Sequence, residues 1–363
     1  MGTECNRAPG RLGVDETELG RRLKAQIQAD GPMTFREFMA QALFAPGLGF
    51  YSKGPALGDP DGPFNTNSLF PAFAFALAAA VEQAEAVLGE SLRIVELGGG
   101  TGELASRILK NLTEPHEYVI VEKSPGLRAK QESLGLRPVS HPSDLPPAPS
   151  FVFGNEVLDA LPVNRVMGEE TGELLEIYVA LDQEGKFVQH LAEPSTPLLA
   201  KRLAEEGISL GRGQIAEISL GLEEFVAEVA SLISMGYLLF IDYGDEATAL
   251  YHYTRRNGSL RCFYKQKHAY DPFDRVGEQD ITADVDFTAI EGSALKEGLM
   301  KAGKVSQGLW LENVGIHQYK EQATNADQAQ DEIFQLVSPA RLGSAFDVLA
   351  FKTRGLPDAP GFS

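Results

Sequence analysis

The chain has 363 residues, 43% of them hydrophobic, so it is long enough for one large domain with insertions or for two smaller domains. Its formal net charge of -19 at pH 7 disfavours nucleic-acid partners and favours a cationic substrate or a basic protein partner. Its two cysteines, Cys5 and Cys262, are distant and do not indicate a disulfide framework, and no CxxC motif or histidine cluster indicates a metal site.

The first 88 residues are expected to form a helical N-terminal lobe. Their start lacks the apolar stretch of a signal peptide and is too acidic for a transit peptide, which favours a cytoplasmic location. A helix is predicted over residues 15–29, and Thr34 and Glu37 have the spacing of a capping box for a second helix over 35–44. The apolar segment 69–88 contains a proline and several acidic or amide side chains, so we expect a buried helix and no membrane span.

Strands and helices alternate in the following segment, as they do in an α/β domain. A predicted strand over residues 92–97 is followed by a glycine loop, a helix and a second strand over 118–122. This order is a βαβ unit, so the two strands should be parallel and adjacent. The apolar runs at 151–153 and 237–242 predict further strands, the latter buried on both faces.

The α/β domain is expected to extend from about residue 89 to residue 355, followed by a short tail at 356–363. Insertions are predicted at about 163–215 and about 245–300, where long stretches separate the strands. The other predicted elements are a hairpin near 177–180 and 186–190, a helix over 222–235 closed by Gly236, and strands over 305–311 and 346–352.

A glycine-rich turn, VELGGGTGEL, lies after the first strand of this domain. Gly98, Gly100 and Gly102 alternate in it, and Glu96 lies two residues before the first of them. This spacing does not fit the G-x-G-x-x-G fingerprint of dinucleotide-binding proteins, but it is common in S-adenosylmethionine methyltransferases. The glycines let the backbone approach a ligand closely, and the carboxylate of Glu96 suits the sulfonium and ammonium groups of adenosylmethionine.

Glu122 ends the second strand, twenty-two residues after Gly100. A carboxylate at this position can accept hydrogen bonds from both hydroxyl groups of a ribose, as in dinucleotide-binding folds. The alternative is that the glycines form an ordinary turn and that Glu122 is a solvated strand end. Together, the glycine loop and Glu122 favour cofactor binding.

Three polar residues, Asn155, Glu156 and Asp159, follow the predicted strand at 151–153 and lie at the carboxyl end of the sheet. On a helical turn, Glu156 and Asp159 would share a face because they are three residues apart. Two carboxylates beside a methyl donor can hold a cationic acceptor, and arginine fits best because its guanidinium is protonated and planar. The alternative is that Asp159 caps a helix and Glu156 faces solvent.

Several segments of the chain occur in the order found in one methyltransferase family. VELGGGTGEL is general to methyltransferases, whereas NEVLDALPV (155–163) and GEQDITADVDFTAI (277–290) are more specific. The other segments are GPMTFREFMAQALFAPGLGFYSKG (31–54), GPFNTNSLFPAF (62–73), VEKSPGLRAKQ (121–131), LLFIDYG (238–244), GSLRCF (258–263) and FDVLAF (346–351). Over about residues 20–353 the chain resembles the MidA family, which includes a mitochondrial protein-arginine methyltransferase that assists assembly of respiratory complex I.

The resemblance implies a class I methyltransferase fold, with a Rossmann-like, mostly parallel seven-stranded sheet, a helical N-terminal lobe and insertions. It implies S-adenosyl-L-methionine as cofactor and a protein partner, for which a respiratory complex subunit is one option, and it leaves the oligomeric state open. Carried over by position, the residues that would contact adenosylmethionine are Glu96, Gly98, Gly100, Gly102 and Glu122. The residues that would border the methyl-transfer site are Asn155, Glu156 and Asp159.

The chain departs from the family pattern at Pro63, Gln266 and Asp284. The family usually has an aspartate in place of Pro63 and a histidine in place of each of the other two. The glycine loop and the Asn-Glu segment match, so donor binding is expected to be retained. The altered segments are expected to line the substrate side, so the acceptor can differ from that of the family.

Four further residues are candidates for the site. Asp242 and Tyr243 end an inner strand, where they lie either at the edge of a pocket or in a turn. Asp280 either adds a third carboxylate to the site or fixes a turn. Tyr51 either lines a substrate channel or packs in the core.

The segment 251–270 contains no acidic residue and carries Arg255, Arg256, Arg261, Lys265, Lys267 and His268. With aromatic residues interleaved, it can be read as an RNA contact, but a surface hairpin that balances an acidic body or docks a partner is favoured. The sequence thus predicts an S-adenosylmethionine-dependent methyltransferase that acts on arginine of a protein. The alternatives are a small-molecule or RNA methyltransferase, and a non-catalytic assembly factor that retains the cofactor fold.

Overall fold

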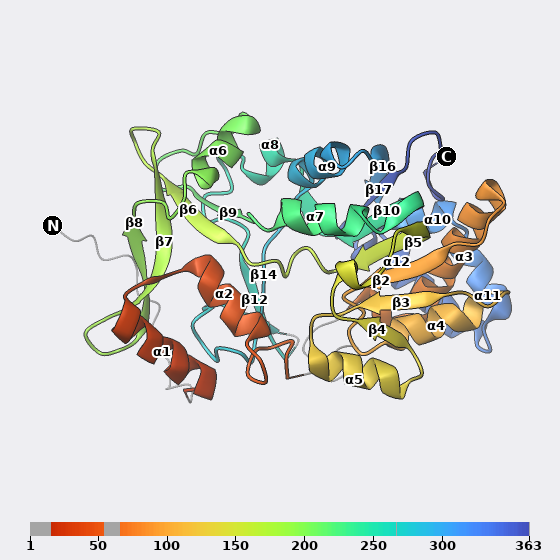
Figure 1. Cartoon of the computed structure of the whole chain (residues 1–363), viewed down its shortest axis with the longest axis horizontal. Coiled ribbons are helices and arrows are strands. Elements are labelled where there is room, and N and C mark those ends of the chain that lie inside the picture. Colours follow the sequence, from red (N-terminus) through yellow and green to blue (C-terminus); the bar gives the residue numbers. More distant parts are fainter. Residues whose placement is uncertain (1–15, 54–65, 266, 363) are drawn as a thin grey trace.

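The computed structural model describes residues 16–53, 66–265 and 267–362 of the chain. Two units lie side by side in it (Figure 1). One is a seven-stranded sheet with helices on both faces, and the other surrounds a five-stranded antiparallel sheet. The α/β class predicted from the sequence is confirmed.

The larger sheet is mixed, with the strand order β16-β17-β10-β5-β2-β3-β4. Neighbouring strands from β10 to β4 pair in parallel, whereas β17 is antiparallel to both β10 and β16. The strands are β2 (Arg93–Leu97), β3 (Tyr118–Val121), β4 (Arg137–Val139), β5 (Ala148–Asn155), β10 (Ile233–Asp242), β16 (Met300–Ser306) and β17 (Asp347–Lys352). The parallel pairing of β2 with β3 confirms the predicted βαβ unit.

Successive side chains of the central strands enter two hydrophobic cores, one on each face of the sheet. Ile94 of β2 packs on one face and Val95 on the other. The first core contains α3 (Pro71–Leu88), α4 (Glu103–Asn111), α10 (Gln307–Asn313) and α12 (Ala326–Val337). The second contains α7 (Leu222–Ala230) and α9 (Phe287–Lys296). Shorter helices are α5 (Pro125–Ser133), α11 (Tyr319–Gln322), η1 (Asn67–Leu69), η2 (Pro142–Asp144), η3 (Ile316–Gln318) and η4 (Leu342–Ser344).

Helix α3 is the one helix in the described part of the chain that is long and apolar enough to cross a membrane. Its side chains Phe73, Leu77 and Val81 are at most 1% exposed and pack in the first core. The structure therefore accounts for the apolar composition of α3 by burial against the sheet, as the sequence predicted.

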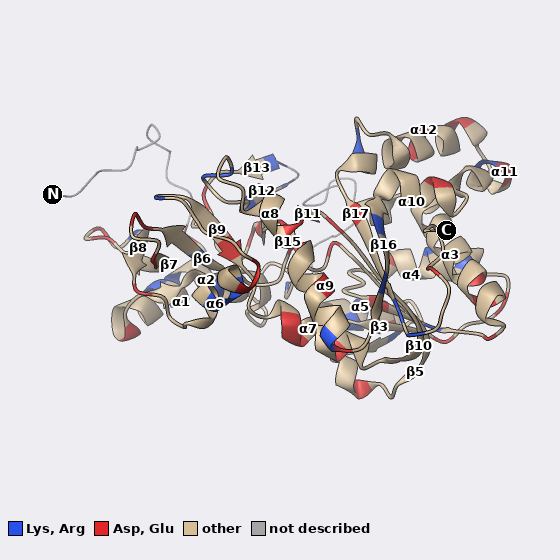
Figure 2. Cartoon of the chain, turned by 90° about the horizontal axis from the view of Figure 1, so that it is seen from above, with Lys and Arg blue, Asp and Glu red and all other residues tan. Residues whose placement is uncertain are grey.

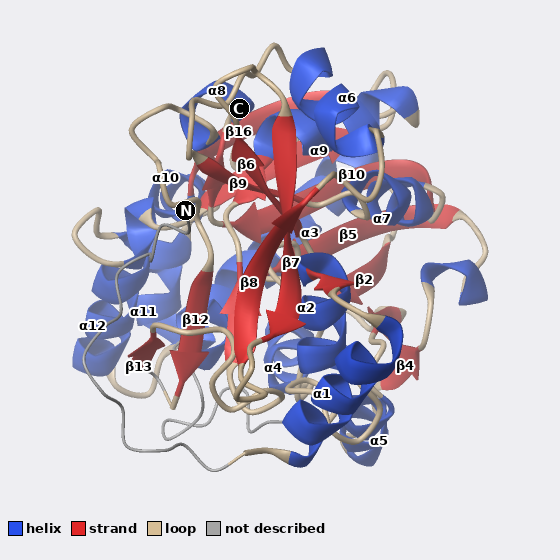
Figure 3. Cartoon of the chain, turned by 90° about the vertical axis from the view of Figure 1, so that its left-hand side faces the viewer, coloured by secondary structure: helices blue, strands red, loops and turns tan. Residues whose placement is uncertain are grey.

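The smaller sheet is formed mainly by the first predicted insertion. All of its strand pairs are antiparallel: β1 (Met33–Thr34), β6 (Asn164–Gly168), β7 (Leu174–Leu181), β8 (Phe187–Ala192) and β9 (Ile215–Ile218). The predicted hairpin is β7 and β8 (Figure 3). Helices α1 (Glu18–Asp30) and α2 (Phe35–Phe44) pack in the core of this unit, and the capping box of Thr34 and Glu37 is present.

The described part of the predicted N-terminal lobe is therefore shared between the two units. Helices α1 and α2 belong to the core of the smaller sheet, whereas α3 packs on the larger one. The predicted boundary at residue 88 does not coincide with this division of the packing. The reason is that β1 pairs with β7, so the N-terminal segment completes a sheet whose other strands come from residues 164–218.

The second predicted insertion connects the two units through short strands. A three-stranded antiparallel sheet contains β12 (Arg261–Tyr264), β13 (Lys267–Ala269) and β14 (Asp280–Thr282). The other elements are β11 (Gly244–Asp245), β15 (Val285–Asp286) and α8 (Ala247–Leu250), while α6 (Leu198–Glu205) packs beside the smaller sheet.

Two predicted elements differ from the structure. The helix predicted over 222–235 ends at Ala230, and Gly236 lies inside β10, where a Cβ atom would be 2.0 Å from the carbonyl oxygen of Ser150. Glycine at 236 thus permits close strand packing and does not close a helix. The strand predicted over 305–311 ends at Ser306, whose hydroxyl caps α10.

Candidate active site

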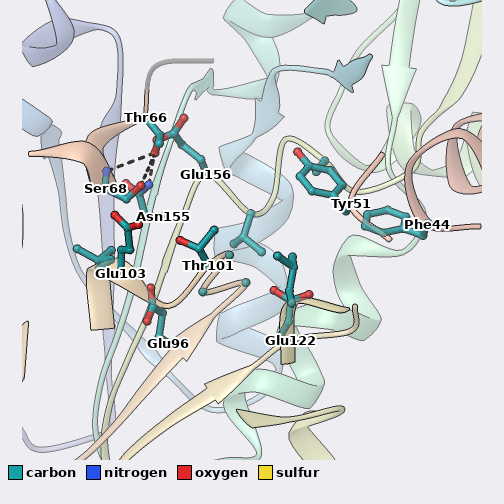
Figure 4. A pocket seen from close by; sticks show the side chains of 17 residues that line it. Phe44, Tyr51, Thr66, Ser68, Glu96, Thr101, Glu103, Glu122, Asn155 and Glu156 are labelled. Atoms are coloured by element: carbon teal, nitrogen blue, oxygen red, sulfur yellow. Dashed lines mark hydrogen bonds between the residues drawn. The ribbon is translucent and has the colours of Figure 1, made fainter. Parts of the chain in front are cut away.

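A cavity lies at the carboxyl ends of β2, β3 and β5, where ligands of parallel α/β sheets bind. It contains about 930 Å³ of empty space, part of which is open to solvent. Figure 4 shows Glu96 and Glu122 on one side of this donor cavity, Asn155 and Glu156 on another, and Tyr51 with Phe44 near its edge.

The glycine loop forms one wall of the donor cavity. Gly98, Gly100 and Gly102 have φ angles of 65°, 53° and 82°, in the left-handed region that favours glycine. At Gly99, a Cβ atom would lie 2.6 Å from Ile120 and 3.1 Å from the carboxyl carbon of Glu96. The loop therefore has little room for side chains and presents its backbone to the cavity.

Glu96 is 3% exposed, and its carboxylate accepts a hydrogen bond from the Tyr118 hydroxyl at 2.8 Å. The pKa of Glu96 is raised to about 7, mainly by burial and also by the nearby carboxylate of Glu122, while the hydrogen bond from Tyr118 lowers it. Within residues 16–53, 66–265 and 267–362, Glu96 forms no ion pair with a lysine or arginine. A buried carboxylate without a cation suits a ligand that brings a positive charge.

Glu122 lies immediately after β3, as the sequence predicted, and is 8% exposed. Its Oε1 accepts a hydrogen bond from the backbone N–H of Ser124 at 2.8 Å. Burial raises the pKa of Glu122 to about 7, although hydrogen bonds from Ser124 and Gly100 lower it. The side chain lines the donor cavity, where a carboxylate can accept hydrogen bonds from hydroxyl groups of a ligand.

Glu156 lies at the end of β5 and has a φ angle of 52°, which takes the chain out of the strand. Its Oε1 accepts hydrogen bonds from the Thr66 hydroxyl at 2.7 Å, the Asn155 side-chain amide at 2.9 Å and the Asn67 backbone N–H at 3.2 Å. Burial at the cavity floor raises the pKa of Glu156 to about 7. Three donors fix this oxygen, whereas the other oxygen of Glu156 accepts no hydrogen bond from the described residues.

On a helical turn Glu156 and Asp159 would share a face, but the structure has no helix directly after β5. In the loop at this position the carboxylate of Asp242 accepts hydrogen bonds from the backbone N–H groups of Val157, Leu158 and Asp159 at 3.2, 2.9 and 3.4 Å. Asp242, at the end of β10, therefore holds the loop and is not among the residues that line the donor cavity.

Asp159 is 5% exposed and accepts a hydrogen bond from the Tyr243 hydroxyl. Burial raises the pKa of Asp159 to about 6, while Tyr243 and the positive charge of Arg261 lower it. Asp159 thus neither caps a helix nor faces bulk solvent.

A second cavity of about 1110 Å³ adjoins the donor cavity. Tyr51 and Glu156 line both, so the two spaces meet at these side chains. Its other lining residues are Asp159, Tyr243, Arg261, Phe263, His268, Asp280, Leu342, Ala345 and Phe346. We call it the acceptor cavity because it lies on the far side of Glu156 from the glycine loop.

Asp280 adds a third carboxylate to the acceptor cavity. It is 3% exposed and accepts a hydrogen bond from the Tyr51 hydroxyl at 2.9 Å. The pKa of Asp280 is raised to about 8 by burial and by the negative charge of Asp159. Tyr51 therefore lines both cavities, and it also packs against the core of the smaller unit.

Asp284, one of the three departures from the family pattern, pairs with Arg255 and Arg261. The guanidinium carbon of Arg261 lies 4.5 Å from the ring centroid of Tyr243, so the pairing holds this arginine against the wall of the acceptor cavity. The other two departures, Pro63 and Gln266, lie outside the described residues.

Sequence reasoning assigned no role to Thr66 and Asn67, although both are in a segment that resembles the family. Asn67 is fully buried and connects Asn155 with Gln307 through its side-chain amide, at 3.1 and 2.7 Å. The polar run Asn-Thr-Asn directly before an apolar helix was the available signal.

The residues of the donor cavity fit adenosylmethionine. Buried carboxylates face a ligand that has a sulfonium, an ammonium and two ribose hydroxyls, and the glycine loop leaves room for it. A metal site is not indicated, since the described residues contain no group of three or more metal-ligating side chains that could hold an ion.

A protein family described as "Putative S-adenosyl-L-methionine-dependent methyltransferase" matches residues 74–305, which is more than half of the chain. The chain belongs to this family. The methyltransferase activity and the cofactor predicted from the sequence are thereby confirmed.

A solved structure from Burkholderia thailandensis, with bound S-adenosyl-homocysteine, is 34% identical to this methyltransferase. The match has a TM-score of 0.84 and covers 94% of this chain and 93% of that chain. The mitochondrial protein arginine methyltransferase NDUFAF7 homolog of Drosophila melanogaster is 28% identical, covering 92% of this chain and 84% of that protein. The human protein of this name is 24% identical over 92% and 83%. The Drosophila and human relatives are named as mitochondrial, whereas the cytoplasmic location of this methyltransferase stays a prediction.

Proposed function

We propose that this methyltransferase transfers a methyl group to a guanidinium nitrogen of an arginine in a protein partner. The observation that carries the proposal is the acceptor cavity, where Glu156, Asp159 and Asp280 place three carboxylates beside the donor cavity. A protonated guanidinium is planar and offers donors in a fork that matches paired carboxylates.

In this proposal, the donor cavity orients adenosylmethionine, which supplies an electrophilic methyl group when bound. Glu96 would hold the positively charged part of the donor, and Glu122 would accept hydrogen bonds from the ribose hydroxyls. Gly98, Gly100 and Gly102 give the backbone close approach to the ligand.

Glu156 has the central role on the acceptor side, because its side chain lines both cavities. Asn155 and Thr66 fix one oxygen, so the other can accept a hydrogen bond from the terminal nitrogen of an arginine. As the new carbon–nitrogen bond forms and the carbon–sulfur bond breaks, this nitrogen loses a proton. Glu156 or Asp159 can accept that proton, because their raised pKa values, about 7 and about 6, are close to neutral pH.

The printed names of the curated relatives support arginine as the acceptor, since those proteins are named protein arginine methyltransferases. A respiratory complex subunit as the partner remains a prediction from the family resemblance. A non-catalytic assembly factor would have no need for carboxylates at the junction of two cavities.

The test is Glu156→Gln, assayed with labelled adenosylmethionine and lysate proteins followed by mass spectrometry for methylarginine. Glutamine keeps the size and the hydrogen-bond acceptor but loses the charge, so methyl transfer should fall by at least about 100-fold. Calorimetry should show unchanged donor binding, and the exposed Glu90→Gln should behave as the wild type. Loss of donor binding in the Glu156 variant, retained transfer, or label on no protein arginine would refute the proposal.

A further inference from the structure

The hairpin of β12 and β13 forms one wall of the acceptor cavity and carries positive charge. Residues 251–270 contain five lysines and arginines and no acidic residue, in a chain whose net charge is -19. Figure 2 shows blue segments at β12 and β13, close to the middle of the molecule. This charge is concentrated beside a cavity whose floor is acidic.

Strand pairing orders the side chains of this wall from the cavity floor outward. Phe263 pairs with Asp280 on one side and with His268 on the other, so the three share one face of the small sheet. Asp280 is buried, Phe263 is half-buried and His268 is exposed. A substrate side chain extended along this wall would place its charged end at Asp280 and its backbone near His268.

Three side chains of the hairpin, Lys265, Lys267 and His268, form what we call the basic rim together with Arg275 of the loop that follows β13. Arg275 and Lys265 lie over the ring of Tyr264, at 4.5 and 5.4 Å from its centroid. None of the four has a carboxylate partner among the described residues. By contrast, Arg255 and Arg261 share the carboxylate of Asp284 as an ion-pair partner.

We propose that the basic rim binds acidic side chains next to the acceptor arginine, so that the substrate is an arginine flanked by aspartate or glutamate. This inference rests on the proposed function, because the acidic floor must take the arginine itself. His268 of the rim lines the acceptor cavity, so the rim adjoins the place where the arginine would enter. Neighbouring residues of an extended segment are about 3.3 Å apart, which keeps residues one to three positions from the arginine close to this rim.

The charge pattern favours a peptide over RNA as the occupant. A basic strip with interleaved aromatic side chains can bind single-stranded nucleic acid. Here, however, the strip forms one wall of the cavity that Glu156, Asp159 and Asp280 also line, and a phosphate chain laid across the cavity mouth would meet these carboxylates. A segment with a central cation and flanking acids complements both the floor and the rim.

The test uses synthetic peptides with one central arginine, flanked by aspartates, by serines or by lysines. At low salt, the full-length enzyme should methylate the aspartate-flanked peptide with a kcat/KM about tenfold above that of the serine peptide, and the lysine peptide should be poorest. This preference should shrink in about 0.5 M salt, because exposed charges are screened.

The double variant Lys265→Glu/Lys267→Glu should lose the preference, so that the ratio of its kcat/KM for the aspartate peptide to that for the serine peptide falls to about one or below. Its matched control is Lys110→Glu/Lys130→Glu, the same charge change at exposed positions of α4 and α5 on the larger unit. The control should keep the full preference.

Binding of the same peptides, measured by fluorescence anisotropy, separates this inference from the proposed function. Methylation without a preference for flanking acids would overturn the inference and leave arginine methylation intact. Binding of the acidic peptide that depends on the rim, without methylation of any arginine, would support the rim and refute the proposed acceptor. Tighter rim-dependent binding of a single-stranded RNA than of the acidic peptide, or no binding of any probe, would overturn the inference.

Discussion

Replacing Glu96 by glutamine should stabilise the methyltransferase at neutral and higher pH while it weakens donor binding. Glu96 is buried, it has the Tyr118 hydroxyl as its hydrogen-bond donor, and its pKa is raised to about 7. Above that pH the folded protein must hold a buried negative charge, which costs free energy. Glutamine keeps an oxygen that accepts from Tyr118 and carries no charge.

The direction and size of the effect follow from the pKa shift. A carboxyl whose pKa is higher in the folded than in the unfolded state binds its proton more tightly when folded. The free energy of unfolding therefore falls as the pH rises from the ordinary value of 4.5 through 7. Between about pH 5.5 and about pH 8.0 the Glu96 contribution to this fall is about 2 kcal/mol, and the variant lacks it.

The assay is urea unfolding of both proteins without ligand at the two pH values. The stability of Glu96→Gln relative to wild type should rise by about 2 kcal/mol from the lower pH to the higher. In calorimetry at about pH 6, wild type should release about one proton more than the variant on binding adenosylmethionine, because the charged donor requires the ionised carboxylate. A stability difference that does not change with pH would refute the reasoning.

The remaining predictions concern the glycine loop, the loop after β5 and the pH dependence of transfer. Gly99→Ala should reduce donor affinity at least about tenfold in calorimetry, because its Cβ would lie 2.6 Å from Ile120 and close to Glu96; unchanged affinity would contradict the close packing. Asp242→Ala removes the acceptor of three backbone N–H groups, so kcat should fall about 100-fold while donor binding persists. Loss of donor binding would contradict the role of Asp242 as the residue that holds the loop after β5. The kcat/KM for an arginine peptide should rise with pH between about 5.5 and 8, since Asp159 and Glu156, with pKa values of about 6 and about 7, must be ionised to hold a guanidinium; a flat profile would contradict this role.

The sequence predicted the parts of this enzyme that depend on neighbouring residues. The βαβ unit, the capping box of α2 and the glycine loop each have a local cause in side-chain period or backbone freedom. Glu96 and Glu122 were expected at strand ends beside that loop, and the structure places both on the donor cavity. The helix predicted over 222–235 failed because strand pairing with β5 outweighed a short helical pattern.

Contacts between distant residues decided the rest of the site. The hydroxyl of Thr66 reaches Glu156 across 90 residues of sequence, and the hydroxyl of Tyr51 reaches Asp280 across 229. Asp242 imposes the loop conformation that turns Asp159 toward the acceptor cavity. Composition and motifs therefore predicted the cofactor and the family, because the donor-binding residues Glu96 to Glu122 lie in one continuous βαβ unit. The acceptor cavity was decided only by tertiary structure, because its walls come from segments that packing alone brings together.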